Sequence, residues 1–140
     1  MSRIRWGRVI GAAVLSELGV FAALFAAIAA YSLVTPTFSA AESGDEVGYY
    51  VAPAAGAIMT LLATLWATRR LTSAVVLHGV LIGVVSVILT AGFIFTARPE
   101  HRVMYVISFG LRLAAGSVGG VIAQRMSTAR TTAASLRQPA

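Results

Sequence analysis

The chain contains no cysteine and no lysine, and it is poor in acidic residues. Its 140 residues include 5 Asp and Glu and 11 Lys and Arg, and all of these basic residues are arginine. The absence of cysteine excludes disulfides, thiol chemistry and cysteine-ligated metals, and it leaves the redox compartment undetermined. Charged residues make up 11% of the sequence and hydrophobic residues 58%, whereas soluble domains are about 25% charged. A soluble fold of this length would lack the polar side chains to cover its surface.

The apolar residues occur in four runs, each long enough for a membrane-spanning helix of about 20 residues. We therefore predict an all-α, polytopic membrane protein with four transmembrane helices in an antiparallel bundle. The expected spans are residues 9–34, 49–68, 73–96 and 103–123, within a single domain over residues 1–125. Pro36, Ser43 and Gly44 indicate a loop before the second span, and Pro53 falls in the first turn of that span. Residues 126–140 are polar and are expected to form a disordered tail.

The arginines predict the orientation of the chain. One group lies at the N-terminus, in the link between the second and third spans, and after the fourth span: Arg3, Arg5, Arg8, Arg69, Arg70, Arg125, Arg130 and Arg137. Arg98 and Arg102 lie on the other side of the predicted membrane, together with the acidic loop that follows the first span. Positive residues stay in the cytoplasm, so both termini are expected there, and Trp6 and Trp66 mark the same boundary. The first run is far longer than the core of a signal peptide, so we expect it to be retained.

Pairs of glycine four residues apart predict where the helices pack. Gly79 and Gly83 lie in the third span, and Gly116 and Gly120 lie in the fourth. Small residues at this spacing let helix backbones approach closely in lipid. Packing within the chain is the simpler interpretation, and a homodimer face is the alternative.

Three ionisable residues lie within the predicted spans: Glu17, His78 and Arg112. Helix rise places Glu17 about 12 Å and Arg112 about 16 Å from the inner edge of the membrane, so a pair between them is feasible. The simplest hypothesis is a structural ion pair that fixes how the first and fourth spans meet. One alternative is that Glu17 binds a proton or a cationic substrate while Arg112 tunes the pKa of Glu17. Another is that either residue faces a water-filled vestibule.

Few patterns point to other chemistry. His78 and His101 are expected near opposite faces of the membrane, and no carboxylate or thiol completes a metal or haem ligand set. Phosphate-binding loops, nucleophile elbows and catalytic carboxylate pairs are not found. Because a nucleophile, a metal ligand set and an acid–base pair are all lacking, we expect no enzymatic activity and no cofactor. We expect no nucleic-acid partner, because the arginines flank apolar runs. His78 is interpreted as a packed, hydrogen-bonded histidine, with a proton relay as the alternative.

A resemblance that covers most of the chain rests on three stretches: IRWGRVIGAAVLSEL, ATRRLTSAVVLHGVLIG and YVISFGLRLAAGSVGG. With them the sequence resembles small uncharacterised four-helix bacterial inner-membrane proteins. The resemblance implies an inner (plasma) membrane location and carries no activity.

The length, the four spans and the single glutamate of the first span are also similar to the small multidrug resistance transporter family. That resemblance implies a shared proton and cation site at Glu17. The sequence departs from the family around "SELGVF", lacks a clear aromatic cage, and adds Arg112, which would compete for the carboxylate. Its arginines also favour a single orientation.

The sequence thus predicts an integral membrane protein that acts as a non-enzymatic accessory or interaction subunit. A homodimer or a larger membrane complex is the expected assembly. A small proton-coupled transporter or channel that uses Glu17 is the alternative.

Overall fold

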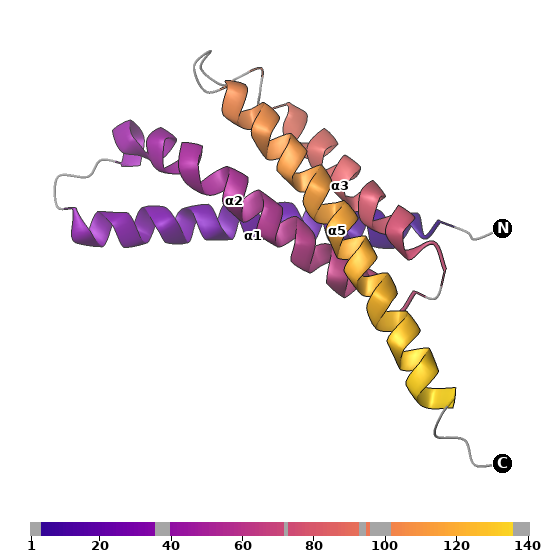
Figure 1. Cartoon of the computed structure of the whole chain (residues 1–140). Coiled ribbons are helices and arrows are strands. Elements are labelled where there is room, and N and C mark those ends of the chain that lie inside the picture. Colours follow the sequence, from indigo (N-terminus) through magenta and orange to yellow (C-terminus); the bar gives the residue numbers. More distant parts are fainter. Residues whose placement is uncertain (1–3, 36–39, 72, 93–94, 96–101, 136–140) are drawn as a thin grey trace.

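A computed structural model describes residues 4–35, 40–71, 73–92, 95 and 102–135 of the chain (Figure 1). Four helices account for most of these residues: α1 (Trp6–Val34), α2 (Ala40–Thr68), α3 (Val75–Ala91) and α5 (Arg102–Ser135). The described ranges contain no β-strand. The all-α prediction is therefore confirmed for this part of the chain.

Three of the helices have the length and composition of a membrane span. These segments are Trp6–Val34 in α1, Glu46–Thr68 in α2 and Arg102–Ala129 in α5. Helix α3 is apolar but has 17 residues, which gives a length of about 26 Å at 1.5 Å per residue. This length falls slightly short of a hydrocarbon layer of about 30 Å, and the predicted span continues to residue 96, beyond the helix. The fourth crossing stays a prediction.

Helix α2 begins earlier than the sequence predicts. It starts at Ala40 rather than near residue 49, so Gly44 lies inside a helix and not in a loop. Isolated glycine lowers helix propensity by only about 1 kcal/mol, and the acidic residues of this segment favour a helix N-terminus. Pro53 consequently lies well inside α2 and is buried, so its predicted place in the first turn is wrong. It removes one hydrogen bond from the helix.

Helix α5 continues farther than the sequence predicts. A disordered tail was expected from residue 126, but α5 extends to Ser135, so the expectation is wrong for residues 126–135. This segment contains neither glycine nor proline and includes several alanines, which have the highest helix propensity. The remaining predicted tail, residues 136–140, lies outside the described residues.

The helices form two closely packed pairs that cross each other. Helix α1 packs along α2, and α3 packs along α5, while α2 also packs against α5 (Figure 1). Helix α3 touches α1 as well, whereas α1 and α5 approach each other at few residues. The buried residues of α1 all lie between Val9 and Val20. Its C-terminal half lies beside α2 (Figure 1).

The distribution of side chains is the reverse of that in a soluble protein. Large apolar side chains face outward, and Leu33 is 85% exposed and Phe25 68%. The buried hydrophobic residues are mostly alanine and valine, and they are accompanied by many buried polar residues. Water disfavours such a large apolar exterior, while lipid tolerates it and rewards close contact of small residues. The structure thus agrees with an integral membrane protein.

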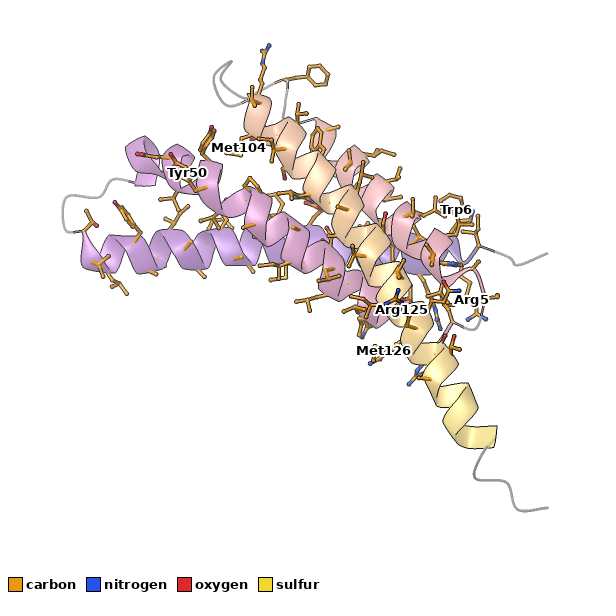
Figure 2. All side chains as sticks on the ribbon, in the orientation of Figure 1. Arg5, Trp6, Tyr50, Met104, Arg125 and Met126 are labelled. Carbon is orange, nitrogen blue, oxygen red and sulfur yellow. The ribbon has the colours of Figure 1, made fainter. Side chains whose placement is uncertain are left out.

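At one end of the molecule lie the start of α1, the end of α2, the start of α3 and the later part of α5 (Figure 1). Buried Leu71, Val75 and Ala123 pack together there with Leu65. Figure 2 shows Arg5 and Arg125 toward this end, whereas Tyr50 and Met104 lie toward the opposite end.

Candidate functional site: a buried ion pair among four helices

Glu17 and Arg112 form an ion pair in the interior. Arg112 Nη1 donates a hydrogen bond to Glu17 Oε1. The side chain of Arg112 is 3% exposed and that of Glu17 is 11% exposed. The predicted pair between α1 and α5 is therefore present. It joins the two helices that otherwise have the least contact in the described chain.

Helices α2 and α3 supply the surroundings of this pair. A Cβ atom at Gly56 of α2 would lie 2.8 Å from Arg112 Nε and 3.0 Å from Arg112 Cζ. The absence of a side chain at Gly56 therefore makes room for the guanidinium group. Ser86 of α3 lies beside the Glu17 carboxylate. Each of the four helices thus contributes one residue to a single polar layer.

Packing of α3 against α5 fixes the backbone that carries Arg112. A Cβ atom at Gly83 would lie 3.0 Å from the Arg112 carbonyl oxygen. One turn away, a Cβ atom at Gly79 would collide with the Gly116 carbonyl oxygen and lie 2.8 Å from Gly120 Cα. The four glycines singled out in the sequence therefore meet one another between α3 and α5. Only glycine allows this approach, so a side chain at any of the four positions would force α3 and α5 apart.

A row of polar side chains on α2 continues from this layer toward the arginine-rich end. Thr60, Thr64 and Thr68 are all buried at intervals of one helical turn. Thr60 Oγ1 and Ser16 Oγ of α1 share a hydrogen bond of 3.1 Å, and Thr68 Oγ1 donates to the Thr64 carbonyl oxygen at 2.6 Å. These residues were not among the predicted site residues. Their spacing of four residues on an otherwise apolar helix is the signal that marks them as an inward stripe.

His78 is 2% exposed and lies apart from the ion pair, near the start of α1. Its Nε2 atom accepts a hydrogen bond of 3.1 Å from the backbone N–H of Arg5. Its Nδ1 atom lies 2.8 Å from the Ala74 carbonyl oxygen. A backbone N–H only donates and a carbonyl only accepts, so these partners require a neutral imidazole with its proton on Nδ1. His78 therefore links the N-terminal end of α1 to α3 through hydrogen bonds.

Ala74, whose carbonyl oxygen is the partner of His78 Nδ1, has an unusual backbone conformation. Ala74 precedes α3 with φ 52° and ψ 32°, and its conformation is left-handed. This conformation costs an alanine about 1–2 kcal/mol because Cβ crowds the following carbonyl oxygen. The Ala74 carbonyl oxygen accepts from the His78 backbone N–H at 3.0 Å and also faces the imidazole. The turn thus aims this carbonyl oxygen at His78.

Three buried polar atoms lack a hydrogen-bond partner within the described residues: Arg112 Nε, Ser86 Oγ and Thr64 Oγ1. The first two flank the ion pair. Arg112 uses one of its five N–H donors on Glu17 and keeps Nε unsatisfied beside Gly56. The layer therefore contains polar atoms besides those of the ion pair, and these atoms are available for a further hydrogen bond.

Candidate metal ligands are not clustered within the described residues. These residues contain no cluster of three His, Cys, Asp or Glu side chains that could hold a metal ion. His101 lies outside the described residues. The site holds an ion pair and has further polar atoms that are able to form hydrogen bonds.

Comparison with known proteins adds no relative. The chain matches no protein-family model, no curated protein and no solved structure. The function must therefore be argued from the site and the surface.

Proposed function

We propose that the protein is an integral inner-membrane protein of bacteria with four spans and both termini in the cytoplasm. In this proposal it acts as a non-enzymatic accessory or interaction subunit, in the manner of the small uncharacterised four-helix membrane proteins that its sequence resembles. In this proposal helix α3 makes the fourth crossing.

The observation that carries this proposal is that Glu17 is bound to Arg112. A carboxylate that binds protons or cations during transport must exchange its partner. Glu17 instead holds a permanently charged arginine, and both side chains are shielded from the exterior. Removing one partner would leave a buried charge without compensation, which is strongly unfavourable. The pair therefore suits a structural role that specifies how the four helices assemble.

The exterior supports an interaction role. The C-terminal half of α1 carries exposed Phe25 and Leu33, and Figure 1 shows it beside α2. A membrane partner or a second copy would contact α1 here without disturbing the ion pair. Lipid occupies the same surface when no partner is bound.

Proton flux distinguishes this function from transport. The full chain is reconstituted into liposomes that contain a pH-sensitive dye, and a potassium gradient with valinomycin supplies the driving force. We expect the flux to equal that of protein-free liposomes and to be unchanged by Glu17→Gln. Purification from the native membrane in a mild detergent should also yield a stoichiometric protein partner or a stable homodimer. Proton flux that Glu17→Gln abolishes would refute the accessory role.

The alternative is a small proton-coupled transporter or channel. The observation that favours it is the pair of unsatisfied atoms, Arg112 Nε and Ser86 Oγ, beside the carboxylate. A water molecule that bonds these atoms would give Glu17 a route for proton exchange. In that case Ser86→Ala would lower the flux, whereas Ser117→Ala, at a position away from the pair on α5, would not.

A further inference from the structure

We propose that the arginine-rich end of the molecule binds the phosphate groups of anionic phospholipids. The inference rests on the proposed membrane location. The basic end is defined by five residues whose side chains the structure describes: Arg5, Arg8, Arg69, Arg70 and Arg125.

These arginines come from separate parts of the chain and converge on one end. Arg5 and Arg8 lie at the start of α1, Arg69 and Arg70 directly follow α2, and Arg125 lies on α5. Arg8 is half-buried and the other four are exposed. Arg5 and Arg125 are drawn toward the same end in Figure 2.

No acidic side chain neutralises this end within the described part of the chain. Glu17 is engaged by Arg112. Glu46 lies on α2, 23 residues before Arg69, and so about 35 Å away along the helix axis. The basic end therefore presents five positive charges to a partner.

The backbone below these arginines is held in place. The Arg5 backbone N–H is bonded to His78 of α3. The cluster of Leu71, Val75 and Ala123 joins the α2–α3 link to α5. Arginines on an ordered backbone lose less conformational entropy on binding than arginines on a flexible tail do.

Two tryptophans set the depth of the basic end in the bilayer. Trp6 and Trp66 are each 53% exposed, and tryptophan is enriched at the headgroup level of membranes. The Arg69 guanidinium carbon lies 5.6 Å from the centroid of the Trp66 ring. This contact places a cation at the depth where lipid phosphates lie.

Lipid fits these features better than a soluble anion does. Guanidinium groups bind phosphate oxygens through two parallel N–H donors. Each arginine near an anionic surface contributes about 1 kcal/mol, equivalent to about a fivefold change in affinity. Zwitterionic lipids offer the same phosphate with a compensating cation, so the preference is for headgroups with net negative charge.

Quenching of tryptophan fluorescence measures the preference for anionic lipid directly, because both tryptophans of the sequence lie at the basic end. The full chain is reconstituted into phosphatidylcholine bilayers that contain an equal fraction of brominated phosphatidylglycerol or brominated phosphatidylcholine. We expect the anionic lipid to quench severalfold more effectively. The double variant Arg70→Gln/Arg125→Gln should reduce this preference toward equality while the Arg69–Trp66 contact is kept. Arg102→Gln, at the other end of α5, should leave it unchanged.

Each outcome decides a different claim. Equal quenching by both lipids would overturn the preference for anionic lipid and would leave the membrane location intact. An anionic preference that the double variant leaves undiminished, or that Arg102→Gln reduces equally, would overturn its assignment to the basic end. Absence of quenching by either lipid would place both tryptophans outside the bilayer and would contradict the proposed function itself.

Discussion

Arg112 of α5 reaches Glu17 of α1 although these two helices have few contacts of their own. The guanidinium group lies over Gly56 of α2, and Ser86 of α3 lies beside the carboxylate. The pair therefore connects opposite corners of the helix assembly through its centre. A contact of this kind requires all four helices to be in place, so it specifies the arrangement as a whole.

Glu17→Gln should destabilise the protein more than Glu17→Gln combined with Arg112→Gln. The single variant leaves the Arg112 charge buried without a counter-ion, at a cost of about 3–5 kcal/mol, whereas the double variant removes both charges. Thermal unfolding in detergent of the wild type, both single variants and the double variant gives the coupling energy. Additive losses would show that the two side chains do not act as a pair.

Gly116→Ala should lower the unfolding temperature, because its Cβ would lie 3.1 Å from Gly83 Cα and would press on the Gly79 carbonyl oxygen. Overpacking of this type costs about 1–3 kcal/mol. Gly110→Ala on the same helix is the matched control, since a Cβ there meets nothing within 4 Å. Equal stability of the two variants would rule out close α3–α5 packing.

Ala74→Gly should stabilise the protein by about 1 kcal/mol, because glycine adopts the left-handed conformation without steric cost. Ala114→Gly, at an exposed position inside α5, should have the opposite sign and cost up to about 1 kcal/mol. The comparison is made by thermal unfolding of both variants. Destabilisation by both would show that Ala74 is not in the left-handed conformation.

His78→Phe should release the N-terminal end of α1, because the Arg5 backbone N–H loses its acceptor. Hydrogen exchange of the Arg5 amide, followed by NMR in micelles, should become faster, while the Ala13 amide inside α1 stays protected. Arg5→Gln keeps the backbone donor and should leave the amide at this position as protected as in the wild type. Unchanged exchange in His78→Phe would mean that the imidazole does not hold Arg5.

Much of the fold follows from composition and periodicity. The long apolar runs predict helices because an isolated backbone in lipid must satisfy its own hydrogen bonds. Glu17 and Arg112 were predicted to pair because both charges lie at similar depth in apolar surroundings. The glycine pairs marked the α3–α5 contact for the corresponding reason, since close approach in lipid requires small residues.

Other features depend on tertiary context. The start of α2 and the C-terminal end of α5 were misplaced because weak local signals, such as Gly44 and the polar residues after Arg125, do not stop a helix. The role of Gly56 becomes visible only when a side chain from another helix occupies its space. The partners of His78 are a backbone amide and a backbone carbonyl, and backbone groups have no sequence signature.

Four membrane crossings with both termini on the cytoplasmic side are the central feature of the proposed protein. The sequence contains no cysteine, so the single variants Glu46→Cys, Arg70→Cys and Ala129→Cys can each be labelled in intact cells with an impermeant maleimide. We expect Glu46→Cys to be labelled from outside, and the other two only after the membrane is opened. Labelling of Glu46→Cys and Ala129→Cys from the same side would contradict the account.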